Sequence, residues 1–132
     1  MKTVRLLLAL LFVFTLAMPS QATEQVKVDV LFMNHGPLRT TLNNMQSVFA
    51  KYEGKISVAW HDFETDEGQA FMSSKGLNEH IPLMVWINGN VNQKIDGEDV
   101  AFRGFPTGAG PAFFQGKWNM ELLDKVLNQA SR

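Results

Sequence analysis

The chain has 132 residues, of which 45% are hydrophobic, and its 12 basic and 13 acidic side chains give a formal net charge of −1. This length and composition predict one globular domain, and the charge balance offers no basic surface for nucleic acid. The sequence contains no cysteine, which excludes disulfide exchange, a thiolate nucleophile and a cysteine-bound metal.

Residues 1–22 have the layout of a cleavable export signal. Two basic residues lie near the start, an apolar run covers residues 6–18, and small residues follow. The run is shorter than the roughly 20 residues that a membrane-spanning helix needs, so we expect cleavage after Ala22 rather than an anchor. Residues 23–132 are then expected to form one exported domain, periplasmic or secreted, without membrane insertion.

Hydrophobic periodicity predicts the first elements in chain order. Alternating apolar residues predict a strand over residues 26–33, and apolar residues at steps of three and four predict a helix from Pro37 to Tyr52. A β-branched and aromatic stretch predicts a second strand over residues 56–63. A short helix over about residues 66–75 is expected to follow, so the chain opens with a βαβ unit.

The second half of the chain adds a predicted hairpin and a last helix. Strands over residues 83–87 and 91–95 are expected to pair through a turn at Asn88 and Gly89, because Asn-Gly suits positive φ. The last helix is expected to begin near Asn119, a good N-cap residue. The order β-α-β-α-β-β-α predicts an α/β domain with a mixed central sheet and helices on both faces.

Residues 96–116 are rich in glycine, proline and phenylalanine and show no helical period. One interpretation is a surface connector whose phenylalanines enter the core, with residues 100–102 extending the sheet. The other interpretation is a binding loop, since long loops in compact domains are often functional. The phenylalanines concerned are Phe102, Phe105, Phe113 and Phe114.

Three features of the chain resemble the thioredoxin family over nearly all of residues 23–132. The motif His-Gly-Pro-Leu stands between the first strand and the first long helix, where the family has Cys-Gly-Pro-Cys. Ile81-Pro82 stands where the family places its cis-proline. Asp29 stands six residues before the motif, where the family keeps a buried carboxylate. The resemblance implies a thioredoxin-like fold.

Both family cysteines are replaced, the first by His35 and the second by Leu38, so oxidoreductase and isomerase activity through the motif is excluded. What the resemblance still implies is the scaffold: free N–H groups at the start of the helix and a proline loop beside it. The degenerate motif consists of His35, Gly36, Pro37 and Leu38.

Asp29 and the histidines allow further interpretations. A buried Asp29 is either a proton acceptor or a structural acid hydrogen-bonded in place, and without a thiol the structural role is favoured. His35 and His80 are expected to lie close together, where they are either ordinary loop residues or, with Met33 or an acidic neighbour, a copper or zinc site. The family pattern turns Trp60 toward the motif and His61 away from it.

The function expected from these features is binding. The domain would be a redox-inactive, chaperone-like or adaptor protein that contacts an envelope protein or extended peptide, and would not be an enzyme. The alternative is a periplasmic metal-binding protein that uses His35 and His80. An enzyme without thiols would require Asp29 and His35 to be neighbours. The expected contact residues, besides the motif, are Ile81, Pro82, Phe102, Phe105 and Phe113.

Overall fold

The computed structural model describes residues 22–132. The expected export signal therefore lies outside the described residues, apart from Ala22. Among residues 22–132, no helix combines the length and the apolar composition needed to cross a membrane.

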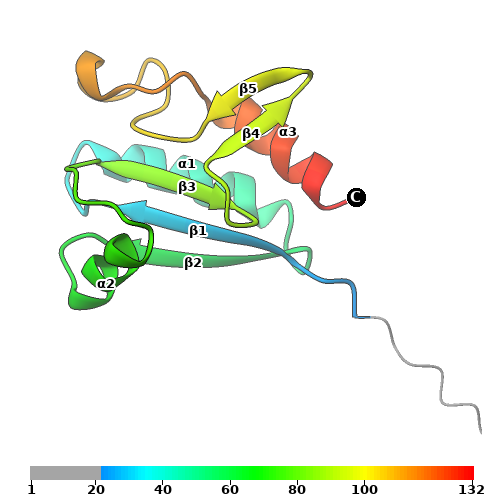
Figure 1. The fold of residues 1–132 in the computed structure, drawn as a ribbon. Coiled ribbons are helices and arrows are strands. Elements are labelled where there is room, and N and C mark those ends of the chain that lie inside the picture. Colours follow the sequence, from blue (N-terminus) through cyan, green and yellow to red (C-terminus); the bar gives the residue numbers. More distant parts are fainter. Residues whose placement is uncertain (1–21) are drawn as a thin grey trace, which may run out of the picture.

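Strands alternate with helices in the first part of the chain, and the helices pack on a small central sheet (Figure 1). In chain order the elements are β1 (Val26–Phe32), α1 (Leu38–Ala50), β2 (Ile56–Asp62), α2 (Asp66–Ser74), β3 (Leu83–Ile87), β4 (Asn92–Ile95), β5 (Glu98–Ala101), the 3₁₀ helix η1 (Ala112–Phe114) and α3 (Met120–Ala130). The helices and first three strands lie where periodicity predicts them. β5 lies within residues 96–116, where an extension of the sheet over residues 100–102 is one expectation, and it pairs with β4.

The central sheet has three strands in the order β2-β1-β3. β1 runs parallel to β2, which requires the crossover through α1, and antiparallel to β3. The sheet is therefore mixed, and the described domain is α/β.

The predicted hairpin after β3 forms only in part. Asn88 and Gly89 make the expected turn with positive φ angles of 49° and 80°, and one bridge joins Ile87 to Asn90. Beyond that bridge, β4 leaves β3 and pairs antiparallel with β5 in a separate two-stranded sheet. The predicted pairing of residues 91–95 with β3 is therefore wrong.

The edge of β3 is occupied by residues 102–104 instead. The Val85 N–H donates to the Phe102 carbonyl (3.0 Å), and the Gly104 N–H donates to the Leu83 carbonyl (2.7 Å). This pairing buries the whole side chain of Phe102, whereas β4 is mostly polar and partly exposed. Burying a phenylalanine contributes about 1.5–3 kcal/mol, so the apolar segment occupies the position next to the core.

Apolar side chains cover both faces of the sheet. Val28 and Val30 point to the face that carries α1 and α3, in the larger cluster of buried residues. Leu31 and Trp86 point to the opposite face, which α2 covers in a smaller cluster. Helices therefore lie on both faces, as the sequence predicts (Figure 1).

Two helices begin at side-chain caps that the sequence supplies. The Thr65 hydroxyl accepts from the Gly68 N–H at the start of α2, and the Asn119 side chain accepts from the Leu122 N–H at the start of α3 (2.9 Å). Such caps satisfy otherwise unpaired donors of the first turn. Asn119 is thus confirmed as the N-cap of the last helix.

Candidate functional site

The degenerate motif forms a closed turn that leads into α1. The Leu38 N–H donates to the His35 carbonyl (3.0 Å), and the Arg39 N–H donates to the Gly36 carbonyl (3.2 Å). Pro37 has no N–H to offer. The expectation that N–H groups at residues 36–39 are free is therefore wrong for Leu38 and Arg39, so this helix start is not an open anion site.

Exposure divides the motif into a surface part and a core part. His35, Gly36 and Pro37 are exposed, whereas Leu38 is buried in the larger core cluster. The turn is anchored through Leu38 and presents one imidazole and one proline ring to solvent.

The proline loop docks against the strand end that precedes the motif. The Met33 N–H donates to the Pro82 carbonyl (3.0 Å), and Pro82 is buried. Residues 22–132 contain no cis peptide bond, so the expected cis-proline at Ile81-Pro82 is wrong. The Ile81 side chain is buried with the cluster under α2.

A small hollow, here called the motif pocket, joins the three segments that the sequence singles out. Its volume is about 160 Å³, similar to that of cavities that accept one benzene ring. The lining comes from the motif, the proline loop and the phenylalanine-rich segment. The residues that line it are Met33, His35, Pro37, Leu38, His80, Pro82, Phe105, Pro111 and Phe114.

The motif pocket is an apolar hollow with the imidazoles of His35 and His80 at its rim. The His35 Nε2 atom lies 3.6 Å from a Glu64 carboxylate oxygen. The His80 ring meets the Phe63 ring edge to face, with 5.6 Å between ring centroids. Both histidines are exposed, so the pocket has apolar walls and an exposed polar rim.

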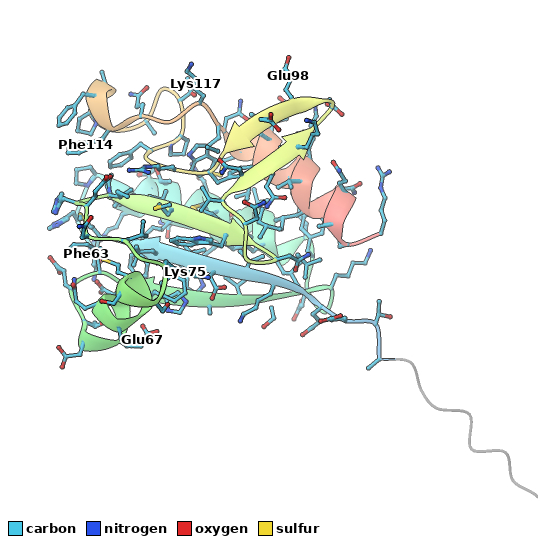
Figure 2. The ribbon with its side chains drawn as sticks, viewed as in Figure 1. Phe63, Glu67, Lys75, Glu98, Phe114 and Lys117 are labelled. Carbon is cyan, nitrogen blue, oxygen red and sulfur yellow. The ribbon has the colours of Figure 1, made fainter. Side chains whose placement is uncertain are left out.

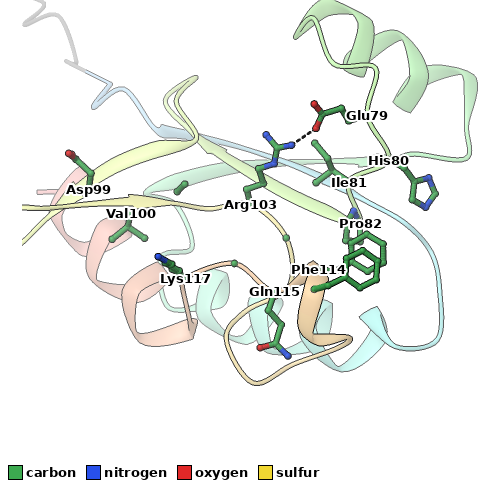
Figure 3. A pocket seen from close by; sticks show the side chains of 14 residues that line it. Glu79, His80, Ile81, Pro82, Asp99, Val100, Arg103, Phe114, Gln115 and Lys117 are labelled. Atoms are coloured by element: carbon green, nitrogen blue, oxygen red, sulfur yellow. Dashed lines mark hydrogen bonds and ion pairs between the residues drawn. The ribbon is translucent and has the colours of Figure 1, made fainter.

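A larger hollow, here called the β5 cleft, adjoins the motif pocket. It has a volume of about 540 Å³ and runs between β5, the proline loop and residues 113–117 (Figure 3). His80, Pro82 and Phe114 line both hollows. One continuous surface therefore leads from the motif to the edge of β5.

The phenylalanines of residues 96–116 divide between core and surface. Phe102 is fully buried and packs on Trp118 with 5.3 Å between ring centroids, so the expected contact role does not extend to it. Phe105 is 4% exposed and forms part of the pocket wall. Phe113 is 82% exposed and lies against Phe114, with 3.9 Å between ring centroids. The connector interpretation therefore applies to Phe102 and Phe105, whose side chains are buried, and the binding-loop interpretation stays a prediction for Phe113 and Phe114.

Asp29 is part of a buried polar cluster on the other face of the sheet. Its carboxylate lies 3.0 Å from the His61 Nε2 atom, and the His61 Nδ1 atom lies 2.6 Å from a Glu67 carboxylate oxygen. The Phe71 ring stacks on the imidazole at 3.7 Å between centroids. Figure 2 shows Glu67 on the α2 side of the sheet, away from Phe114. Asp29 is therefore hydrogen-bonded in place, as the structural interpretation expects, and its partner is His61 rather than His35.

Trp60 packs on the opposite side from His61. Its ring meets Phe32 and Phe49 in edge-to-face contacts, with 5.9 and 5.7 Å between centroids. Trp60 thus lies on the face of α1, opposite His61 as expected, but it is not among the residues that line the motif pocket.

The two histidines expected to be neighbours both line the motif pocket. In the part of the chain that the structure describes, however, no group of three or more His, Asp or Glu side chains is placed to hold a metal ion. Met33 lines the motif pocket together with His35 and His80, so the copper or zinc alternative stays a prediction.

Sequence reasoning missed several residues of this surface. Phe114 and Pro111 complete the motif pocket, and Arg103 and Lys117 line the β5 cleft. The sequence carried a composition signal for the phenylalanine-rich segment, but no local pattern distinguishes its exposed aromatic residues from its buried ones.

The fold and the site together define an α/β domain with an apolar pocket beside the end of a mixed sheet. Compared with known families and curated proteins, the chain matches no family model and no curated sequence.

Proposed function

We propose that residues 23–132 form an exported, redox-inactive, thioredoxin-like domain that binds an extended segment of an envelope protein. The observation that carries this proposal is the motif pocket, to which the motif, the proline loop and the phenylalanine-rich segment all contribute. The thioredoxin-like assignment is supported by the motif at the start of α1 and by Pro82 beside it. The absence of cysteine leaves binding, not thiol chemistry, as the use of this surface.

The motif pocket suits one apolar side chain of the partner. Removing such a side chain from water contributes about 1.5–3 kcal/mol, enough to anchor a peptide but not to hold it alone. Within the described residues, no hydrogen bond engages the N–H groups of His80 or Ile81. These donors stand next to the pocket, where an extended partner segment can pair with them.

Phe114→Ala tests the proposal. Random linear peptides of about 12 residues, roughly 40 Å when extended, are selected on residues 23–132, and the affinity of the enriched peptides is measured by fluorescence anisotropy. Removing the Phe114 ring opens one wall of the motif pocket, so binding should weaken about tenfold or more.

Phe71→Ala is the matched control, because Phe71 is also partly buried but lies on the face covered by α2. It should leave affinity unchanged under conditions where both variants are folded. Failure to enrich any peptide, or equal affinity of Phe114→Ala and the unaltered domain, would contradict the proposal.

Export is tested separately. The full chain expressed in a bacterium with a Sec pathway should be recovered from the envelope fraction as a mature form beginning at Thr23, because the apolar run suits cleavage after Ala22. Recovery of an uncut chain from the cytoplasm would contradict the export part of the proposal and leave the peptide-binding part to its own test.

A further inference from the structure

The edge of β5 that faces the β5 cleft has backbone groups without a partner in the ladder. In an antiparallel pair, residues alternate between those that bond across the ladder and those whose N–H and C=O point outward. The Phe102 N–H donates to the Val91 carbonyl (3.0 Å), and the register continues from there through β4 and β5. Val100 therefore bonds to β4, and the backbone groups of Asp99 and Ala101 point away from it.

The cleft lies along this edge. Asp99, Val100 and Ala101 form one side of it, and Gln115 and Lys117 lie on the other (Figure 3). At one end the cleft meets the motif pocket through shared lining residues. An extended chain with one side chain in the motif pocket can therefore continue through the cleft, where it lies beside the outward backbone groups of β5.

The charges of the cleft leave one cation unpaired. Arg103 pairs with Glu79, drawn as the dashed line in Figure 3, and Asp99 pairs with Lys94. Among the ion pairs of residues 22–132, none includes Lys117. An acidic group on the occupant of the cleft would complement this lysine.

We propose that the partner segment adds to the edge of β5 as an extended strand and places an acidic side chain opposite Lys117. Backbone pairing with Asp99 and Ala101 supplies attraction independent of sequence, while the motif pocket and Lys117 select an apolar and an acidic side chain. This inference rests on the proposed function, because the same segment fills the motif pocket. The partner proposed here is an extended peptide that carries an apolar side chain for the motif pocket and an acidic side chain for Lys117.

A second copy of this chain is a poorer occupant. Antiparallel pairing of two β5 edges that sets Asp99 of one copy opposite Asp99 of the other brings like charges together, and like charges across a pair of strands repel. Sedimentation equilibrium without peptide should therefore give a monomer. A dimer that Ala101→Pro dissociates would overturn the peptide as occupant of this edge.

Amide hydrogen exchange, measured by NMR on the unaltered domain with an enriched peptide, tests strand addition directly. Exchange at the N–H groups of Asp99 and Ala101 should slow about tenfold or more when the peptide is saturating, because new hydrogen bonds protect them. Lys94, at an outward position on the far edge of β4, is the control and should not change. A peptide whose binding depends on Phe114 but leaves both amides unprotected overturns strand addition while the proposed function stands. Failure to enrich any peptide overturns both.

Ala101→Pro removes one outward N–H, and loss of one hydrogen bond should weaken binding about two- to tenfold. Lys94→Pro is its counterpart on the far edge of the same ladder; because Lys94 is also the ion-pair partner of Asp99, this control is measured with the peptide whose acid is replaced by its amide, and affinity for that peptide should be unchanged. If either variant does not fold, the exchange experiment decides. Equal affinity of a folded Ala101→Pro variant and the unaltered domain overturns strand addition.

Lys117→Glu tests the acidic group. It should weaken an acid-containing peptide about two- to fivefold, the range of an exposed ion pair, and should not weaken the same peptide with the acid replaced by its amide. Lys55→Glu is the charge control, since Lys55 lies outside both hollows. Equal effects on the acid and amide peptides overturn the assignment of Lys117.

Discussion

The buried pair of Asp29 and His61, with the exposed Glu67 on the other side of the imidazole, permits a sharp prediction about stability. The Asp29 side chain is 7% exposed and that of His61 is 11% exposed, and within the described residues Asp29 bonds to no side chain other than His61. His61→Phe keeps an aromatic ring that can stack on Phe71 but removes both ring nitrogens. The carboxylate of Asp29 is then left buried without a partner.

The expected cost follows from the burial of each contact. Removing the hydrogen-bond partner of a buried carboxylate leaves its desolvation penalty uncompensated, which costs about 1–3 kcal/mol or more. The Glu67 side chain is 64% exposed, so its contact with His61 is worth at most about 1 kcal/mol. A domain of this kind has a total stability of about 5–15 kcal/mol. His61→Phe should therefore remove a measurable share of it, and Glu67→Gln little.

Urea unfolding followed by circular dichroism measures these free energies. The double variant His61→Phe with Asp29→Leu removes both partners, and apolar replacement of a buried pair is often neutral, so it should recover most of the loss. The reasoning is refuted if His61→Phe costs less than about 1 kcal/mol, or if the double variant is no more stable than the single one.

Two further predictions concern other parts of the domain. Burial and a hydrogen bond to Asp124 raise the pKa of Tyr52 above its ordinary value of 10.0. Because the folded state holds the proton more tightly, the free energy of unfolding should keep this contribution below pH 10.0 and should lose it as pH rises through the pKa of Tyr52 in the folded state. The chain has one tyrosine, so ultraviolet absorbance of tyrosinate reports this group alone, and a midpoint at or below the ordinary value would contradict the prediction. A Cβ at Gly68 would lie 1.8 Å from the Asp62 carbonyl oxygen. Gly68→Ala should therefore cost about 1–3 kcal/mol in urea unfolding, whereas Gly36→Ala, where a Cβ meets nothing within 4 Å, should change stability by less than about 0.5 kcal/mol; equal effects would show that the contact is relieved at no cost.

Local patterns predict the elements because each pattern reports an interaction within a few residues. Steps of three and four apolar residues predict α1, alternation predicts β1, and Asn119 predicts the start of α3. The turn at Asn88 and Gly89 follows from their tolerance of positive φ. None of these signals states which strand pairs with which, so the hairpin prediction fails where Phe102 competes for the edge of β3.

The candidate site was predictable in its parts. The motif, the proline loop and the phenylalanine-rich segment, which are the three expected contact segments, do meet at one pocket. The separate roles of the phenylalanines were not predictable, because Phe102 and Phe113 have similar local surroundings in sequence. Phe102 is buried because it pairs with the edge of β3 and packs on Trp118, and its local sequence encodes neither contact.

The sequence by itself determined that this chain has no thiol chemistry, because no residue supplies sulfur as a nucleophile. It also determined the helices, the first three strands and the anchoring of the motif at the start of α1, since these depend on local periodicity and turn chemistry. Only the tertiary structure decided that Asp29 pairs with His61 and that the β5 cleft continues the motif pocket. Both depend on strand register and on which side chains fill the core, and these are properties of the whole packed chain.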